Sequence, residues 1–147
     1  MAAAYHINDD AGLITVRAEG EVAPAALQAI GRALLEDVSF NSELPQLIDF
    51  RGLRMPGNPV ALERLKAFVE REFKSRVNGS VAVVIDDDLD ARLCADVYRI
   101  TCTMARAELF EDYEQALKWI MRREFVPRRP LLQQQNPAQN RCHEPPE

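Results

Sequence analysis

Two short segments near the N-terminus alternate between apolar and polar side chains. Residues 4–8 and 13–19 each show a period of two, with apolar side chains such as Tyr5 and Val16 at every second position. The sequence NDDAG between them has the composition of a tight turn. A period of two is typical of strands with one buried and one solvated face. The pattern therefore predicts an antiparallel β-hairpin.

The next segment changes to a helical period. Apolar residues from Leu27 to Val38 recur at steps of three and four, which predicts a helix with one buried stripe. Pro24 suits the first turn of this helix, because an N–H at that position would have no intrahelical partner. Gly31 lies on the stripe, and we expect it to let the helix approach the sheet closely.

Two further strands are predicted at 44–50 and 80–85, with a helix between them. The second, SVAVVI, is a continuous apolar run rich in β-branched residues, as is typical of a central strand covered on both faces. Asn58 and Pro59 have the chemistry of a helix start. The inward stripe of this helix comprises Leu62, Leu65, Val69 and Phe73, and its charged residues, Lys66 among them, lie outside the stripe or at its borders.

The C-terminal half continues the alternation of strands and helices. Residues 89–104 carry a helical apolar stripe, AELFED offers a short strand, and Asp112 with Gln115 resembles the capping box of a last helix. Helices that alternate with strands require crossover connections, and hence parallel inner strands. The predicted fold class is α/β, a single domain with a mixed sheet and the order ββαβαβαβα.

Composition limits the function classes. The chain has 147 residues, a net charge of −5 and a pI near 5.1, which argue for one domain and against nucleic acid or an anionic membrane as a partner. No apolar run approaches the roughly 18 residues of a membrane span. The N-terminus lacks the pattern of a signal peptide, and three cysteines without CxxC spacing suit reduced thiols. We expect a cytoplasmic protein without stable membrane insertion.

Composition changes after Val126. Residues 127–147 are rich in proline and glutamine and have no apolar period, so this segment cannot bury a core of its own. The sequence therefore predicts a domain over 1–126 and a C-terminal tail over 127–147.

Three passages carry a resemblance to a known family: LIDFRGL at 47–53, SVAVVID at 80–86 and LFEDYEQALKWI at 109–120. In their order and spacing they resemble the SpoIIAA-like domains, relatives of the STAS fold that are grouped near the SEC14 lipid-binding fold. The last passage is the most specific. In the family, a short strand that ends in Phe runs into a helix with an Ala-Leu-x-Trp-apolar pattern, which here comprises Ala116, Leu117, Trp119 and Ile120.

The resemblance implies a bacterial, non-catalytic module that docks onto a protein partner and has no cofactor. In phosphorylated STAS relatives, the corner after the strand equivalent to 47–51 carries a serine, whereas this corner has no hydroxyl group. The leading hypothesis is therefore a regulatory interaction module that lacks the phosphorylatable serine. The alternative, by analogy with the SEC14 relatives, is a carrier of a small apolar or lipid-like ligand. The sequence leaves open whether the chain forms a homodimer.

The resemblance also implies a partner surface, because in STAS relatives this corner and the next helix meet the regulatory partner. A loop methionine adapts to varied contacts, prolines lower the entropy lost on docking, and cations can orient an acidic partner. The candidate partner-binding residues are Met55, Pro56, Gly57, Asn58, Arg64, Arg71 and Lys74. A cavity lined by the two central helices would favour the carrier over the module.

Asp49 is an acidic residue within an otherwise apolar strand. A buried charge is costly unless it is paired. We expect Asp49 to lie near the strand end and to accept hydrogen bonds from backbone N–H groups or from Arg51 or Arg54.

The acidic run VVIDDDLD follows the central strand. Its DxD spacing, Asp86 and Asp88, resembles the nucleophile motif of haloacid-dehalogenase phosphatases. The residues that normally support this motif are missing, so a metal-dependent phosphatase is only a third hypothesis. The preferred interpretation is acidic residues at a helix N-terminus, where the helix dipole favours them. We assign no catalytic, cofactor-binding or metal-binding residue.

Overall fold

The computed structural model describes residues 2–56, 59–87, 96, 100 and 106–121. In chain order, the elements are β1 (Ala2–Asn8), β2 (Leu13–Glu21), α1 (Pro24–Glu36), β3 (Gln46–Asp49), β4 (Leu53–Arg54), α2 (Pro59–Phe68), η1 (Val69–Phe73), α3 (Lys74–Arg76), β5 (Val81–Val84), β6 (Ala107–Phe110) and α5 (Tyr113–Met121).

The strands form one mixed sheet in the order β1-β2-β3-β5-β6. β1 pairs with β2 in antiparallel orientation, and the pairs β2–β3, β3–β5 and β5–β6 are parallel. This confirms the predicted α/β class with a mixed sheet. The predicted order lacked β4, a two-residue strand that pairs in parallel with the end of β2 at Gly20 and Glu21.

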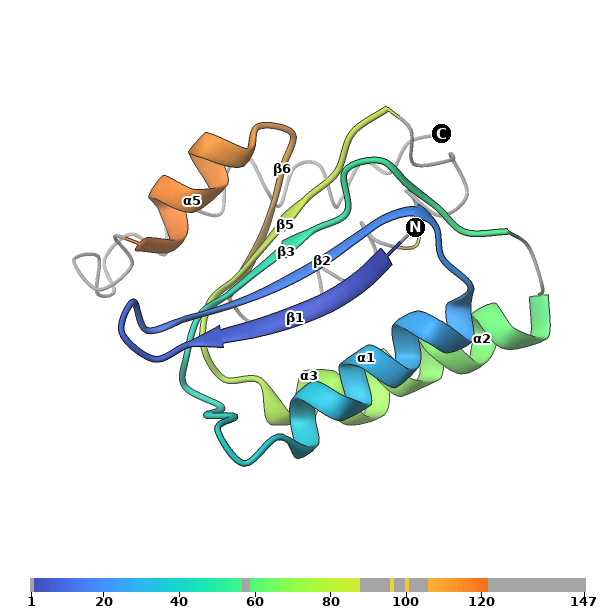
Figure 1. The fold of residues 1–147 in the computed structure, drawn as a ribbon, viewed down its shortest axis with the longest axis horizontal. Coiled ribbons are helices and arrows are strands. Elements are labelled where there is room, and N and C mark those ends of the chain that lie inside the picture. The colour runs from blue at the N-terminus through green and yellow to red at the C-terminus, as the bar shows by residue number, and fades with distance from the viewer. Residues whose placement is uncertain (1, 57–58, 88–95, 97–99, 101–105, 122–147) are drawn as a thin grey trace.

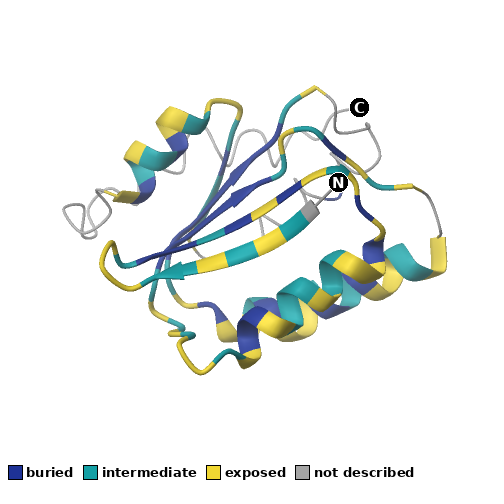
Figure 2. Cartoon of the chain, in the orientation of Figure 1, coloured by how far each residue is buried: buried dark blue, intermediate teal, exposed yellow. Residues whose placement is uncertain are grey.

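Helices cover the sheet on both faces (Figure 1). α1, α2 and α3 lie on one face, which we call the helix-pair face after α1 and α2, and α5 lies on the other. Figure 2 shows that the inner strands are almost wholly buried, whereas the helices alternate buried and exposed positions. The burial pattern of β3 and β5 is continuous along each strand, as expected of strands covered on both faces.

Local signals explain the hairpin and the start of α5. Gly12 has a φ of 68° and its N–H donates to the Asn8 carbonyl at 2.9 Å, which closes the predicted turn. The Asp112 carboxylate accepts from the Glu114 N–H at 2.9 Å, which satisfies one of the free donors at the first turn of α5. Pro24 occupies the first turn of α1, as predicted.

One expectation for α1 is wrong. Val38 was placed on the buried stripe, but α1 ends at Glu36 and the Val38 side chain is fully exposed. The chain leaves the helix in an extended conformation at Asp37, so the helical spacing no longer applies at the next residue, Val38.

The buried residues fall into two clusters, one on each face of the sheet. The larger lies on the helix-pair face and includes Ile14, Val16 and Phe68. The smaller lies under α5 and comprises Leu13, Leu47, Ala82, Val84, Ala116 and Ile120. The predicted helix over 89–104 lies outside the described residues except for Asp96 and Ile100, which are both helical, and the predicted tail over 127–147 lies outside them entirely.

Candidate ligand-binding cavity

A cavity of about 140 Å³ lies between the sheet and the helices α1 and α2. Three side chains from adjacent strands form part of its wall: Val16 of β2, Ile48 of β3 and Val83 of β5. They are direct neighbours in the sheet, because Val16 pairs with Ile48 and Ile48 pairs with Val83. Side chains alternate between the two faces of a strand, so these three lie together on the helix-pair face.

The rest of the wall is also apolar, apart from Gly31, Lys66 and Asp96. The apolar lining residues are Val16, Leu27, Ile30, Leu34, Ile48, Phe50, Leu53, Met55, Leu62, Leu65, Phe68, Val69, Phe73, Val81, Val83 and Ile100. A molecule held here gains free energy chiefly by removing apolar surface from water, at about 25 cal/mol per Å².

The helical wall contains a π-helical turn. The Lys74 N–H donates to the Val69 carbonyl, a step of five residues, at the end of η1. Phe68 and Phe73 are both buried and both line the cavity. In a regular α-helix, residues five apart point about 140° away from each other. The wider turn brings the two rings to one side, and π-helical turns of this kind are frequent at functional sites.

Gly31 sets the close approach of α1 to α2. A Cβ atom at Gly31 would lie 2.8 Å from Cε2 of Phe68, well inside van der Waals contact. The expectation that Gly31 lets the helix approach the sheet is therefore wrong, because its close neighbour is the ring on α2. Arg32 holds the outer side of the same contact: its guanidinium lies 4.9 Å from the Phe68 ring centre and pairs with Glu72 at 2.9 Å.

Lys66 and Asp96 form the polar edge of the cavity. Lys66 Nζ lies 3.6 Å from Asp96 Oδ2 and 3.1 Å from Glu63 Oε2. The Lys66 and Asp96 side chains are only 23% and 12% exposed, whereas Glu63 is 71% exposed. The ammonium group thus connects the cavity wall with solvent, while its aliphatic chain contributes to the lining.

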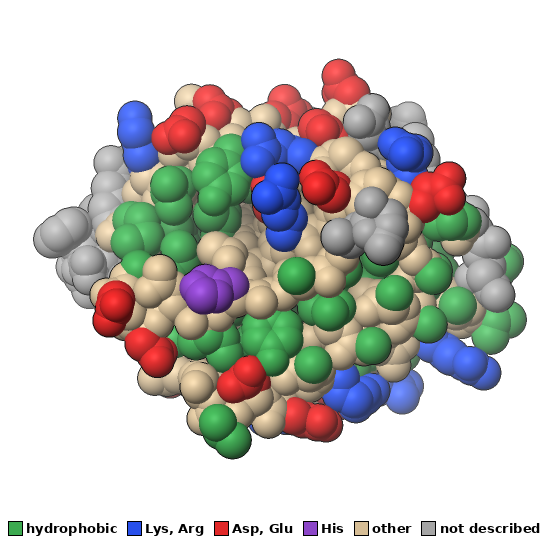
Figure 3. Space-filling model, in the orientation of Figure 1, with side chains coloured by type: hydrophobic (Ala, Val, Ile, Leu, Met, Phe, Trp, Pro, Cys, Tyr) green, Lys and Arg blue, Asp and Glu red, His purple; other side chains and the backbone are tan. Residues whose placement is uncertain are grey.

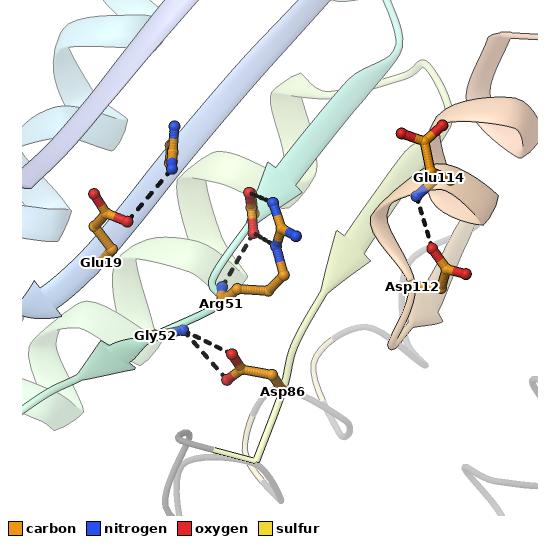
Figure 4. Close-up of polar contacts among 8 residues, drawn as sticks. Glu19, Arg51, Gly52, Asp86, Asp112 and Glu114 are labelled. Carbon is orange, nitrogen blue, oxygen red and sulfur yellow. Dashed lines mark hydrogen bonds and ion pairs between the residues drawn. The ribbon is translucent and has the colours of Figure 1, made fainter.

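A second polar cluster lies on the opposite face of the sheet, where β3 ends (Figure 4). Asp49 accepts two hydrogen bonds from the Arg51 guanidinium, at 2.8 and 2.9 Å, and one from the Arg51 backbone N–H at 3.1 Å. Burial alone would raise the pKa of Asp49, but the hydrogen bonds and charge of Arg51 hold it below its usual value. The expected role of Asp49 is confirmed.

The same cluster fixes the corner after β3. Gly52 has a φ of 77°, and its N–H donates to both carboxylate oxygens of Asp86, at 3.0 and 3.2 Å. The Arg51 guanidinium lies 4.7 Å from the ring centre of Tyr113 on α5. Asp86, the first residue of the acidic run, therefore ties this corner to the end of β5. Asp88 lies outside the described residues, and the phosphatase hypothesis stays untested.

The seven candidate partner-binding residues are only partly brought together. Met55 is half-buried and lines the cavity, Pro56 is exposed, and Gly57 and Asn58 lie outside the described residues. Arg64 and Arg71 are exposed, and Lys74 is half-buried. On the face shown in Figure 3, acidic and basic side chains are interspersed rather than gathered by sign. The partner surface stays a prediction.

Sequence reasoning missed three residues of the cavity wall: Lys66, Phe68 and Asp96. Lys66 is four residues after Leu62, and Asp96 is four residues before Ile100, so both lie on the predicted apolar stripes. The spacing could have identified them as inward charges. Phe68 is three residues after Leu65, so it also fits the α-helical spacing of the stripe, and the π-helical turn that follows brings Phe73 to the same side.

Within the described part of the chain, no group of three or more His, Cys, Asp or Glu side chains is arranged to hold a metal ion. The described helices include none with the length and apolar character needed to cross a membrane. Comparison of the chain with protein-family models, with curated proteins and with solved structures found no match.

Proposed function

We propose that this domain binds a small apolar molecule in the cavity between the sheet and the helices α1 and α2. The observation that carries the proposal is the combination of size and lining. An engineered cavity of about 150 Å³ lined by Leu, Ile and Phe stays dry and binds benzene. The cavity described here has about 140 Å³ and an almost wholly apolar wall.

The expected ligand has about the size of a single six-membered ring. A seven-atom ligand reaches a dissociation constant of 1 mM with about 0.6 kcal/mol per non-hydrogen atom, which is below the ceiling of about 1.5 kcal/mol for very small ligands. A whole lipid acyl chain is several times larger than benzene. Within the SEC14-like alternative, we therefore favour a small cyclic ligand over a lipid.

The cavity changes the order of the two functional hypotheses. Sequence alone favoured a protein-interaction module at the corner around Met55. Met55 instead contributes to the cavity wall, and a cavity lined by α2 together with Asp96 and Ile100 is the feature expected of a ligand carrier. The resemblance to SpoIIAA-like and STAS domains stays part of this proposal.

We further propose that binding occurs without catalysis. Among the described residues of the wall, Lys66 and Asp96 carry titratable side chains, and they pair with each other. A nucleophile or general base would need a partner that activates it toward the ligand. The arrangement supports a protein that holds or senses its ligand.

Isothermal titration calorimetry with toluene tests the proposal. We expect saturable binding to the wild type with a dissociation constant of about 1 mM or lower, and a thermal shift at saturating toluene. Val83→Phe places a ring in the cavity and should abolish binding while the protein stays folded. Val38→Phe makes the same change at a fully exposed side chain and should leave binding intact. Absence of binding to the wild type, or unchanged binding to Val83→Phe, would overturn the proposal.

A further inference from the structure

The polar edge of the cavity indicates which kind of apolar molecule fits it. The Lys66–Asp96 contact is longer than an N–H···O hydrogen bond, because its 3.6 Å separation exceeds the usual range of about 2.7–3.2 Å. Charged groups held this close but not in direct hydrogen-bonding contact can accept a small polar group that bridges them. Asp96 is 8% exposed as a whole residue and its side chain is 12% exposed, so a bridging group would come from the cavity side.

The charges at this edge discriminate between ligand classes. Lys66 contributes one positive charge, and Asp96 and Glu63 contribute two negative charges within 4 Å of its ammonium group. A ligand carboxylate would meet the repulsion of Asp96 and would lose its hydration in an apolar cavity. A hydroxyl group matches both partners, because it can accept a hydrogen bond from Lys66 and donate one to Asp96.

The remainder of the wall favours a ring. Phe50, Phe68 and Phe73 all line the cavity. Contacts between aromatic rings add to the free energy of burial when the rings meet edge to face or offset. A phenyl ring also fits the cavity volume of about 140 Å³, which suits a benzene-sized ligand.

We propose that the cavity selects a small ring that carries one neutral hydroxyl group, such as a phenol, with the hydroxyl between Lys66 Nζ and the Asp96 carboxylate. This inference rests on the proposed function, since it names the ligand class of the same cavity. The ring fills the apolar part of the site, and the hydroxyl replaces the loose ion pair by two hydrogen bonds to charged groups.

Titration calorimetry with three ligands of similar size, toluene, phenol and benzoate, tests this inference. In the wild type, phenol should bind about fivefold to tenfold more tightly than toluene, because hydrogen bonds to charged groups outweigh the loss of one methyl group. Benzoate should bind more weakly than either. Tighter binding of benzoate than of phenol would overturn the inference.

The decisive quantity is the ratio of the toluene and phenol dissociation constants within each variant. Lys66→Met keeps a flexible chain of similar length and removes the ammonium group, so the ratio should fall about tenfold. Asp96→Asn should also lower this ratio, and it tests the inference if Lys66→Met does not fold. Lys118→Met, on α5 and exposed, is the matched control and should leave the ratio unchanged.

The outcomes separate the two proposals. If toluene binds and phenol does not bind more tightly, or if the ratio is the same in Lys66→Met and Asp96→Asn as in the wild type, the hydroxyl preference is wrong and the apolar site stands. If none of the ligands binds the wild type, the proposed function itself is wrong.

Discussion

The two faces of the sheet are built from the same strands, but their side chains pack differently. Under α5, Ala82, Val84 and Ile120 are fully buried, and the buried carboxylate of Asp49 is paired with Arg51. On the helix-pair face, the side chains line a partly open cavity. That face also holds the Gln46 amide, whose two polar atoms have no hydrogen-bond partner among the described residues.

This difference indicates where stability and binding are located. Protein interiors normally reach the packing density of organic crystals, with few voids larger than a water molecule. The fully buried side chains under α5 anchor the sheet, whereas the cavity on the helix-pair face leaves room for a ligand. A comparison of variants on the two faces therefore tests the account without knowledge of the natural ligand.

Truncation of one isoleucine on each face should give the largest effect. Ile120→Ala removes a fully buried side chain under α5 and should lower the free energy of unfolding by about 2–5 kcal/mol. Ile30→Ala, at a half-buried residue of the cavity wall, should cost at most about half as much, because its side chain already borders empty space and solvent. Urea denaturation measures both, and equal losses would contradict the difference between the faces.

Enlargement of two neighbouring valines in β5 should give opposite results. Val84 faces α5 and Val83 faces the cavity. Val84 is fully buried, so Val84→Leu forces an extra methylene into the core and should destabilise the domain by about 1–3 kcal/mol. Val83→Leu extends into the cavity and should be neutral or stabilising by up to about 1 kcal/mol. Thermal denaturation of the two variants decides, and a larger loss for Val83→Leu would mean that the cavity is not accessible from β5.

Replacement of Gln46 should stabilise the protein. Gln46 is 1% exposed, and a buried polar group without a partner costs about 1–3 kcal/mol. Gln46→Met keeps the length of the side chain and removes both polar atoms, so we expect a gain of about 1–2 kcal/mol in the free energy of unfolding. A loss of stability would show that the amide makes a favourable interaction in solution.

The smallest effect should appear in the pH dependence of the α5 face. Since the pKa of Asp49 is lower in the folded protein than in the unfolded chain, where it is about 3.9, its contribution is present above that value and is lost as pH falls through the folded pKa. The difference in stability between the wild type and Asp49→Asn should therefore be larger at pH 7 than at pH 3. A difference that grows on acidification would contradict the pairing with Arg51.

Hydrophobic periodicity predicted most of the fold, because the spacing of apolar residues within a strand or helix indicates which of its faces is buried. The β1–β2 hairpin, β3, β5 and the start of α5 follow from such signals. The periodicity could not give β4, whose two residues are too few to show a period. The periodicity also misplaced Val38, because the spacing of apolar residues does not show where α1 ends.

The cavity could not be predicted in the same way. A void depends on the summed volumes of side chains from distant segments, such as Val16, Leu34 and Phe73, and no local pattern encodes that sum. The π-helical turn adds a change of register within a segment that reads as a regular helix. The sequence places Lys66 outside the apolar stripe or at its border, and the spacing alone does not show that its half-buried side chain lines a cavity.

The ligand site is tested most directly by a nuclear Overhauser measurement with toluene on protein labelled at the valine methyl groups. Val83 and Val84 are adjacent in β5 and point to opposite faces of the sheet. A ligand between the sheet and the helices α1 and α2 should give contacts between the toluene ring protons and the methyl groups of Val83, and none with those of Val84. Contacts at Val84 without contacts at Val83, or saturable binding with contacts at neither residue, would contradict a ligand site between the sheet and the helices α1 and α2.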